Sequence, residues 1–301
     1  MPVHASTKGI SHQEWLEYRR SGIGGSDSSV IMGVNPWKSL FDLWMEKTGE
    51  FVQDISSERM YWGNVLEDVV AKEFMIRRGK KVRRKNAILQ HPEYEWMLGN
   101  LDRVVIGEKA LLECKTTSAF NNWDEVPDYY YAQVQHYMAV TGYEKAYLAV
   151  LIGGQEYKDF VIPRNQPYID GLIEAEKEFW QMVQDKTPPE LDGSESCTKI
   201  INQKYPGGNV EEVDLPMDAF QLVNEYDESK EAEKEAKKRK DAASNKLKDM
   251  LGNHEKGRIY DRKITWSSFS KVVVDTDKLK LEPELYEKYT KEQNQRRFTI
   301  K

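Results

Sequence analysis

The chain has 301 residues, enough for a full hydrophobic core and a smaller second region. Hydrophobic residues make up 39% and charged residues 31%, which is typical of a soluble protein, and no apolar run is long enough to span a membrane. The first residues contain no apolar signal segment, so we expect a cytoplasmic location. Two cysteines, Cys114 and Cys197, are too few for a disulfide framework, an iron–sulfur cluster or a four-cysteine zinc site.

The net charge of −6 argues against a protein that coats nucleic acid over its whole surface. One segment differs, because residues 77–85 (RRGKKVRRK) hold seven basic residues in nine positions. A basic patch of this kind can steer a polyanion to one face of an acidic protein. A solvated helix end followed by an edge strand explains the same residues equally well.

Three short helices are expected first. Ser11 and Glu14 form a capping box for a helix that stops at Ser21-Gly22. The glycine loop 22–25 leads to Ser26-Asp27, which we expect to cap a second helix that ends at Gly33. The third helix begins at Ser39 and ends at Gly49. A glycine loop before a helix can hold a phosphate, although such loops are more often simple turns.

Residues 58–78 predict a longer helix in which Gly63, Glu67, Val70 and Phe74 share one face. A carboxylate on an otherwise apolar face is costly unless it is paired. Glu67 is therefore expected either in a structural salt bridge or at a metal site. Residues 80–90 are then expected to form a strand.

Residues 98–117 (LGNLDRVVIGEKALLECKTT) predict a β-hairpin that turns at 107–109. Glu113 and Lys115 are two residues apart on the return strand, so their side chains point to the same face, and the hairpin can bring Asp102 to that face. Two carboxylates and an ammonium in one place favour a hard divalent cation beside a group that orients or deprotonates water. Taken alone, Glu113 and Lys115 also fit an ordinary ion pair on a strand.

Residues 129–141 predict a helix with Tyr130, Gln133, Tyr137 and Val140 on one face, where amide and hydroxyl groups can bind a phosphate or a metal-bound water, or simply lie in a half-buried core. Strands 146–152 and 156–162 and a helix 166–186 follow. This order predicts an α/β fold with a mixed central sheet flanked by helices. A boundary at residues 187–194 separates the core (1–187) from a C-terminal extension (188–301).

In the extension, residues 216–252 predict a long amphipathic helix. It resembles a coiled-coil arm, although a helix that packs against the main domain is an equal alternative. Short strands are expected in IYDRKITWSSF (259–269), KVVVDT (271–276) and RRFTIK (296–301), around a helical stretch at 277–290.

Four blocks in this order resemble the YqaJ-type phage recombination nucleases, relatives of the lambda exonuclease in the PD-(D/E)xK superfamily. The blocks are RRSGIGGSDSSVIMGVNPWKSLFDLWMEKTG (19–49), YWGNVLEDVVAKEF (61–74), LGNLDRVV with LLECKTT (98–117), and YYYAQVQHYMAVTG (129–142). The resemblance covers roughly residues 11–186, and the tail is similar as well. It implies the PD-(D/E)xK nuclease core and Mg²⁺-dependent 5′→3′ digestion of linear double-stranded DNA, with Mn²⁺ as a substitute. The products would be 3′ single strands for an annealing recombinase.

The resemblance also implies roles for individual residues. Asp102 and Glu113 match the metal-binding carboxylates, the backbone carbonyl of Cys114 matches a further ligand, and Lys115 matches the catalytic lysine. The remaining matches are Glu67 at the edge of the metal site, Gln133, Gln135 and Tyr137 on the helix beside it, and Arg19 and Ser26 at the DNA 5′-phosphate. One position departs from the superfamily pattern, because Leu101 replaces the proline before Asp102.

A ring-shaped homotrimer that threads DNA ends is implied by the same resemblance. Two alternatives stay open at the level of sequence. One is an endonuclease on the same fold, and the other is a non-catalytic recombination adaptor that uses the 216–252 helix to bind a recombinase. The complete set of Asp102, Glu113 and Lys115 argues against the adaptor.

Overall fold

The structure is a computed structural model that describes residues 2–50, 57–209, 211–292 and 296–300. Its internal contacts divide the chain into two units, Met1–Tyr205 and Pro206–Lys301. The division lies later than the expected boundary at residue 187. The reason is that α7 (Glu195–Lys204) buries Cys197 and Ile200 in a cluster with Phe41 and Trp44 of α3 (Leu40–Thr48).

The N-terminal helices follow their capping signals, with one correction. Helix α1 (His12–Arg20) has the expected capping box between Ser11 and Glu14, and α3 is capped by Ser39 and ends at Gly49, whose φ of 75° is left-handed. The predicted cap of α2 (Gly25–Ile31) was wrong, because Gly24 and not Ser26-Asp27 occupies the N-cap position. Asp27 lies inside the first turn instead, where its carboxylate accepts the Gly24 N–H at 2.9 Å.

The central sheet confirms the expected mixed α/β architecture. Its five strands run in the order β2-β5-β6-β7-β8, with β6 and β7 parallel and every other neighbouring pair antiparallel. Their bounds are Val82–Arg84 (β2), Arg103–Val105 (β5), Ala110–Thr117 (β6), Lys145–Ile152 (β7) and Glu156–Pro163 (β8).

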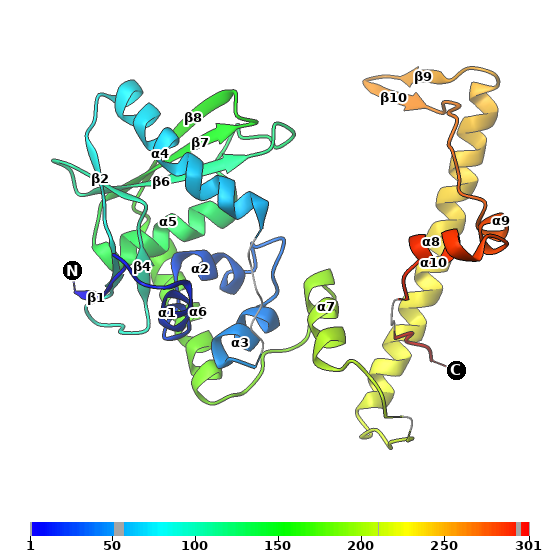
Figure 1. Ribbon diagram of the computed structural model, residues 1–301, viewed down its shortest axis with the longest axis horizontal. Helices are drawn as coiled ribbons and strands as arrows, with labels where there is room; N and C mark the ends of the chain where they lie inside the picture. Colours follow the sequence, from blue (N-terminus) through cyan, green and yellow to red (C-terminus); the bar gives the residue numbers. More distant parts are fainter. Residues whose placement is uncertain (1, 51–56, 210, 293–295, 301) are drawn as a thin grey trace. The chain divides into compact units, whose positions relative to one another are not determined.

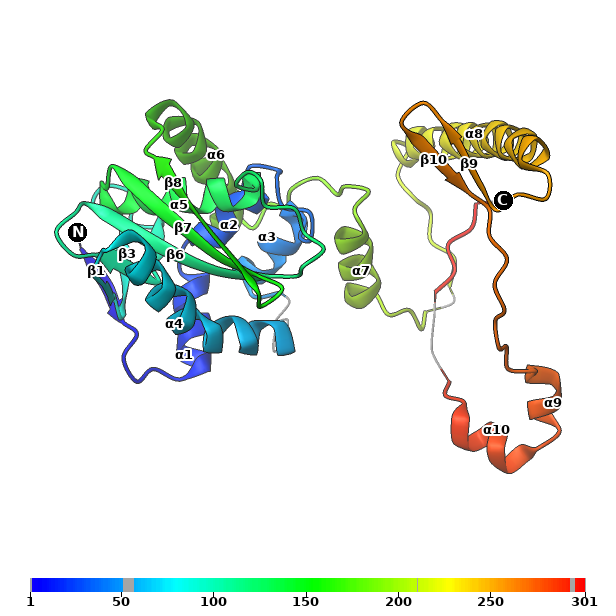
Figure 2. The ribbon, with the colours of Figure 1, turned by 90° about the horizontal axis from the view of Figure 1, so that it is seen from above.

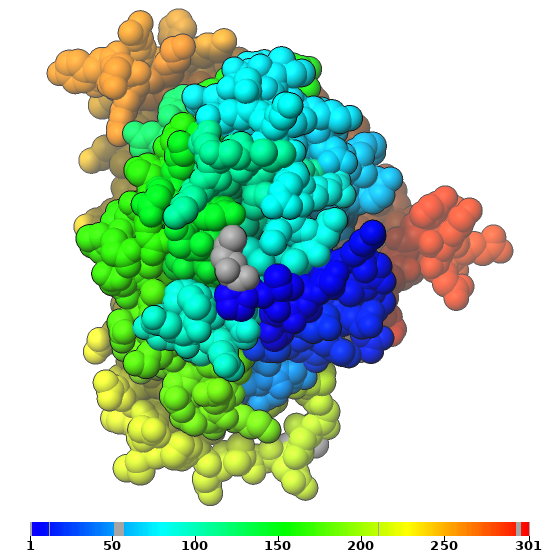
Figure 3. Space-filling model, turned by 90° about the vertical axis from the view of Figure 1, so that its left-hand side faces the viewer, coloured from blue at the N-terminus to red at the C-terminus, as the bar shows by residue number. Residues whose placement is uncertain are grey.

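A second, three-stranded sheet was not predicted. It pairs β3 (Ala87–Gln90) with β1 (Val3–Ser6) and with β4 (Leu98–Asn100). The single strand expected at 80–90 is therefore two strands in different sheets. The outgoing strand of the hairpin is interrupted at Leu101-Asp102 for the same reason, since β4 and β5 belong to separate sheets. On the surface drawn in Figure 3, the N-terminal segment in blue lies beside the segment near residue 90, as the pairing of β1 with β3 requires.

Two helices cover opposite faces of the central sheet (Figures 1 and 2). Helix α4 (Glu58–Arg78) contributes Val70, Ala71 and Phe74 to one hydrophobic cluster, where they meet the side chains of Leu112 and Tyr147. Helix α5 (Asp128–Thr141) covers the other face, and α6 (Gln166–Gln184) packs against α5. Because alternate residues of a strand face opposite sides, Leu111, Glu113 and Lys115 of β6 point toward α5.

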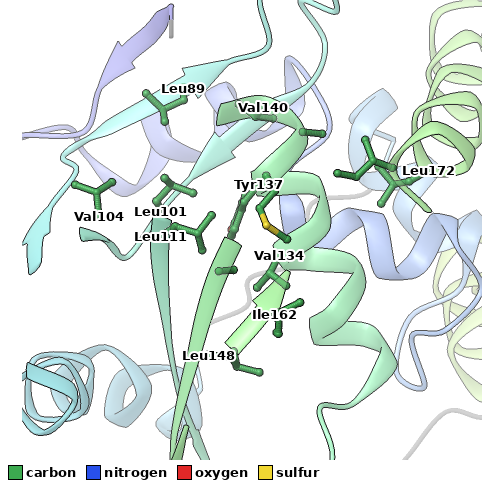
Figure 4. Packing of buried hydrophobic residues seen from close by; sticks show 14 of the residues in the cluster. Leu89, Leu101, Val104, Leu111, Val134, Tyr137, Val140, Leu148, Ile162 and Leu172 are labelled. Carbon is green, nitrogen blue, oxygen red and sulfur yellow. The ribbon is translucent and has the colours of Figure 1, made fainter. Parts of the chain in front are cut away.

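The core on the α5 side explains why β6 is fixed there. Figure 4 shows Leu111 and Leu148 of the two parallel strands directed toward Val134 and Tyr137 of α5. All four are buried, and β6 and β7 keep an unbroken register over eight residues, from Ala110 opposite Lys145 to Thr117 opposite Ile152. The side chains at the end of β6 are thus held by a strand that pairs with β7 along its whole length.

The C-terminal unit contains the expected long helix, α8 (Ala219–Leu251), followed by a hairpin of β9 (Lys256–Ile259) and β10 (Arg262–Thr265). The helical stretch is split into α9 (Thr276–Lys280) and α10 (Pro283–Tyr289). The strands predicted at 271–276 and 296–301 were wrong over the described residues, since residues 271–275 and 296–300 form no strand. None of the described helices combines the length and the apolar content that crossing a bilayer requires.

Candidate active site

Glu113 and Lys115 meet at the carboxyl half of β6. The ammonium nitrogen Nζ of Lys115 donates to Oε1 of Glu113 at 2.8 Å, which confirms that the two side chains share a face. Glu113 is 3% exposed although its side chain is polar and ionisable, so it needs partners inside the protein. Gln133 of α5 supplies one, because its amide nitrogen donates to the same Oε1 at 2.8 Å.

Asp102 reaches this place from the break between β4 and β5. Its Oδ2 accepts the backbone N–H of Cys114 at 2.8 Å, which holds the carboxylate against the strand residue between Glu113 and Lys115. Strand β5 pairs with β6 only up to Leu112. The backbone N–H of Cys114 therefore faces Asp102 and not a neighbouring strand. Because the carbonyl of a strand residue points to the same edge as its N–H, the carbonyl of Cys114 lies on the Asp102 side as well.

Helix α5 forms the wall opposite β6. Gln133 also donates to the hydroxyl of Tyr137 at 3.1 Å, so these two residues share a face as the helical spacing predicts. The ring of Tyr130 lies against Lys115, with Nζ 4.8 Å from the ring centroid, a cation–π geometry. Gln135 points elsewhere: its amide binds the carbonyl of Pro163 and the N–H of Asn165, so the structure does not bring it to the cluster.

The electrostatics of the cluster favour a bound cation. Burial raises the pKa of Asp102 well above its ordinary value, and the charge of Glu113 raises it further. Burial likewise raises the pKa of Glu113, although Lys115 and Gln133 act against this. For Lys115 burial alone would lower the pKa, but the charges of Glu113, Tyr130 and Asp102 outweigh burial and raise it. Ionising two neighbouring carboxylates is costly, and a divalent cation bound between them would offset that cost.

The donor set fits magnesium. Oε2 of Glu113 is buried and has no hydrogen-bond partner, which leaves one carboxylate oxygen for a ligand. Magnesium is commonly held by one or two carboxylates and keeps several waters, and Asp102, Glu113 and the carbonyl of Cys114 provide oxygen ligands. In the part of the chain that the structure describes, no three His, Cys, Asp or Glu side chains converge closely enough to hold a metal on their own. Water would have to complete the coordination.

Glu67, which lies on an otherwise apolar face of α4, has an oppositely charged partner. Arg103, which is 4% exposed, forms an ion pair with Glu67 and a second one with Asp68, and donates to the backbone carbonyl of Asp102 at 2.6 Å. The structural salt bridge is therefore present, and the carboxylate of Glu67 lies at the edge of the cluster. Arg103 was missed by the sequence reasoning, although an arginine at the start of the buried strand Arg103–Val105 signals a paired acid.

A second polar cluster surrounds Arg19. Its guanidinium binds Oδ1 of Asp27 at 2.9 Å, and Nζ of Lys47 binds Oδ2 of the same carboxylate at 2.7 Å. Burial would raise the pKa of Asp27, but the charges of Lys47 and Arg19 outweigh burial and hold it well below its ordinary range. Lys47 also donates to the carbonyls of Arg19 and Gly22 at 2.7 Å each. Asp27 and Lys47 thus fix the loop that carries Arg19, and the sequence reasoning assigned neither this role.

The Arg19 cluster opens into a cavity of about 100 Å³. Arg19 and the exposed Ser26 both line it. Tyr137 lines the same cavity, and its hydroxyl faces Gln133 on the other side. The structure therefore joins the Arg19–Ser26 cavity to the carboxylate cluster through one aromatic side chain.

Much of the basic segment 77–85 is neutralised. Arg77, Arg78, Lys80 and Arg84 form ion pairs with Glu73, Asp159, Glu108 and Asp68, respectively. Paired basic residues attract a polyanion less than isolated ones do. The segment is consequently a weaker steering surface than its composition predicts.

Comparison with known proteins places these residues in context. A family model described as a YqaJ-like viral recombinase domain matches residues 14–144. The uncharacterized protein YqaJ of Bacillus subtilis (strain 168) is 45% identical over 309 residues, which cover 99% of this chain and 97% of that protein. Protein D345L of African swine fever virus (strain Badajoz 1971 Vero-adapted) is 34% identical over 55 residues, 18% of this chain and 16% of the viral protein. Among solved structures, the alkaline exonuclease LHK-Exo from Laribacter hongkongensis has a TM-score of 0.49 at 18% identity, covering 58% of this chain and 93% of that one.

Proposed function

Because this chain belongs to the YqaJ family of viral recombinase domains, we propose that it is a magnesium-dependent exonuclease that digests linear double-stranded DNA in the 5′→3′ direction. Its products would be 3′ single strands for a single-strand annealing recombinase of a phage-type recombination pair. The observation that supports this proposal is the cluster of Asp102, Glu113 and Lys115, in which one buried carboxylate oxygen of Glu113 lacks a hydrogen-bond partner.

The chemistry follows from the positions of these groups. Magnesium, held by Asp102, Glu113 and the carbonyl of Cys114, would polarise the phosphate and lower the pKa of a bound water, and Mn²⁺ would substitute. The ammonium of Lys115 would stabilise negative charge on the phosphate and orient the attacking water. Gln133 keeps Glu113 in place, and the ring of Tyr130 limits the directions open to Lys115.

The Arg19–Ser26 cavity gives this nuclease a place to hold the 5′-phosphate of a DNA end. A guanidinium has five N–H donors, so the ion pair of Arg19 with Asp27 leaves others for a phosphate. Tyr137 lies between this cavity and Gln133. A 5′-phosphate in the cavity would therefore set the position of the scissile bond relative to Glu113 and Lys115.

The function is tested with a time course on linear duplex DNA labelled at each end in turn, with Mg²⁺ and with chelator. We expect release of 5′-terminal nucleotides that depends on the metal, and no cutting of covalently closed circular duplex. Cutting of the closed circle would instead identify an endonuclease.

Replacement of Lys115 by alanine tests the mechanism. We expect Lys115→Ala to lower the rate of digestion by about 100- to 1,000-fold, as the loss of one preorganised charge at a reacting centre does. Lys109→Ala is the matched control, because Lys109 is an exposed lysine in the turn before the same strand. Equal digestion by Lys115→Ala and the parent protein would refute the assigned role.

Replacement of Arg19 tests the end-binding site. Arg19→Ala is expected to remove the preference for 5′-phosphorylated over 5′-hydroxyl ends while Mg²⁺ binding, measured by calorimetry, is retained. Arg20→Ala is the control, since Arg20 is the next residue of α1 and does not line the cavity. If the parent protein digests both kinds of end at the same rate, Arg19 does not have this role.

A further inference from the structure

Helix α8 exposes a seam that is apolar toward both ends of the helix and contains polar residues in the middle. Starting from Ala219, residues at alternating spacings of three and four lie on one side of the helix, the heptad pattern of a coiled coil. Exposed apolar residues occupy both ends of this seam, with Leu222 at 66%, Leu247 at 42% and Met250 at 81%. The seam residues are Ala219, Leu222, Tyr226, Ser229, Glu233, Ala236, Lys240, Ala243, Leu247 and Met250.

Within the described residues of the C-terminal unit, most of this seam is uncovered. Its C-terminal segments contact other sides of α8: Trp266 lies under Lys248, and Gly257 lies against Leu251. On the seam, Phe298 contacts the ring of Tyr226, which is still 38% exposed. Large apolar side chains exposed on one side of a helix are typical of a surface that packs against another helix.

The charges of α8 are separated along its axis. Residues 219–234 contain five acidic and two basic side chains, a net charge of −3, whereas residues 235–250 contain three acidic and six basic ones, a net charge of +3. Two such helices repel when they are parallel, because like halves lie together. They attract when they are antiparallel, because each acidic half lies along a basic half.

The polar residues in the middle of the seam point to the same orientation. In a parallel pair, Glu233 would face Glu233 of the other helix, and Lys240 would face Lys240. In an antiparallel pair with the same centre, Glu233 faces Ala236 of the second copy and Ser229 faces Lys240. The apolar ends then match as well, with Leu222 against Leu247 and Ala219 against Met250. Polar seam residues of this kind commonly fix the register and orientation of coiled coils.

We infer that α8 pairs with α8 of a second copy of this chain as an antiparallel, two-fold symmetric coiled coil. Such an interface uses the same surface on both copies and closes at two helices. The pairing lies wholly within the C-terminal unit and leaves the carboxylate cluster untouched, so it is independent of the nuclease proposal.

Among the charged residues beside the seam, the antiparallel pair contains one repulsive contact, and this makes the orientation testable. Glu225 lies near Lys246 of the second copy, which is favourable, but Lys230 lies near Lys237. Lys230→Glu turns both symmetric repulsions into attractions, so we expect the dissociation constant to fall by about tenfold at low salt. In a parallel pair, Lys230 would instead lie near Glu225, and the same substitution would raise the dissociation constant.

The experiment measures the mass of the full-length protein by sedimentation equilibrium. The double variant Leu222→Asp, Leu247→Asp is expected to halve the mass of the assembly, whereas the control Phe220→Asp, at an exposed apolar position off the seam, leaves the mass unchanged. Unchanged DNA digestion by both variants shows that the first unit is folded. No change of mass in the double variant would overturn the pairing.

Orientation is read by disulfide cross-linking between two tagged copies. A mixture of Ser229→Cys and Lys240→Cys proteins is expected to give mainly the mixed cross-link, and each protein alone should give little. The native cysteines do not compete, because Cys114 and Cys197 are buried in the other unit. Cross-linking of Ser229→Cys with itself, or weaker association of Lys230→Glu, would overturn the antiparallel arrangement.

Discussion

At the scale of single residues, Tyr137 is constrained by contacts on several sides near the site. Its hydroxyl binds Gln133, its ring lines the Arg19–Ser26 cavity, and the backbone of Gly25 lies directly against it. A Cβ on Gly25 would be 2.4 Å from Cε1 of Tyr137, closer than carbon atoms can approach. Glycine is therefore needed at this position for space and not for an unusual backbone angle.

Gly25→Ala is accordingly expected to displace Tyr137 and to destabilise the protein by about 1–3 kcal/mol, the usual cost of overpacking a core. The free energy of unfolding is measured by urea titration. Gly24→Ala is the matched control, because the added Cβ would lie 3.6 Å from its nearest neighbour, an ordinary contact. Equal stability of the two variants would contradict the packing argument.

Residues whose relationship is local can be placed from the sequence alone. Glu113 and Lys115 are two apart on one strand, and Gln133 and Tyr137 are four apart on one helix, so periodicity alone places each pair correctly. The partners of Glu67 and Asp27 could not be predicted in the same way. Arg103 and Lys47 come from other elements, and only the tertiary fold brings these charges together.

At the scale of elements, a buried polar network fixes α5 relative to its neighbours. His136 lies between the carboxylate of Glu176 on α6 and the carbonyl of Leu98 on β4, with 2.8 Å from a ring nitrogen to each oxygen. Ser28 of α2 donates to the same oxygen of Glu176 at 2.6 Å. Both ring nitrogens face acceptors, which a histidine satisfies fully only when both carry protons. Gln133 and Tyr137 are held by the helix that this network anchors.

Stability should therefore depend on pH through His136. Burial would lower the pKa of His136, but the charge of Glu176 and its hydrogen bonds outweigh burial and raise it. The charged pair stabilises the fold fully below about pH 6.5, the ordinary histidine pKa, and this contribution is lost as the pH rises through the folded pKa. We expect the free energy of unfolding to fall with rising pH in that range, and Glu176→Gln to flatten the profile. Parallel profiles for the two proteins would exclude this origin.

Elements with strong local signals were predicted well. The capping box of α1, the glycine after α3 and the turn between β5 and β6 are each encoded within a few residues. The sheet of β1, β3 and β4 was missed because its pairing joins residues near 5, 88 and 99. Strands of three or four residues carry little periodicity of their own, and long-range pairing alone makes them strands.

At the scale of the whole molecule, the first unit contains both polar clusters and all of the core that supports them. The C-terminal unit is different, since α8 buries only Leu251 and exposes most of its apolar residues. The domain boundary predicted at residue 187 was based on a proline-rich turn. The packing of α7 on α3, which no local pattern signals, moves the boundary to residue 205.

Residues 1–205 alone are expected to fold with the denaturation midpoint of the first unit in the full-length protein, and to keep the proposed metal-dependent digestion. Residues 1–187 alone should be less stable, because Cys197 and Ile200 no longer cover Phe41 and Trp44. Each buried side chain of this size contributes about 1.5–3 kcal/mol. Urea titration of the two fragments measures the difference, and equal midpoints would show that α7 is not part of this core.

The parallel pairing of β6 with β7 has a consequence for the order in which the protein matures during synthesis. Asp102, Glu113, Lys115 and Gln133 leave the ribosome close together, but β6 receives its neighbour only when β7 has followed α5 out of the exit tunnel. Glu176, which fastens α5, emerges later still. A nascent chain therefore passes through a period in which the acidic side chains are translated but not yet buried. The residues of the first unit leave the tunnel before those of α8, so the carboxylate cluster can assemble in each copy before α8 meets a second one.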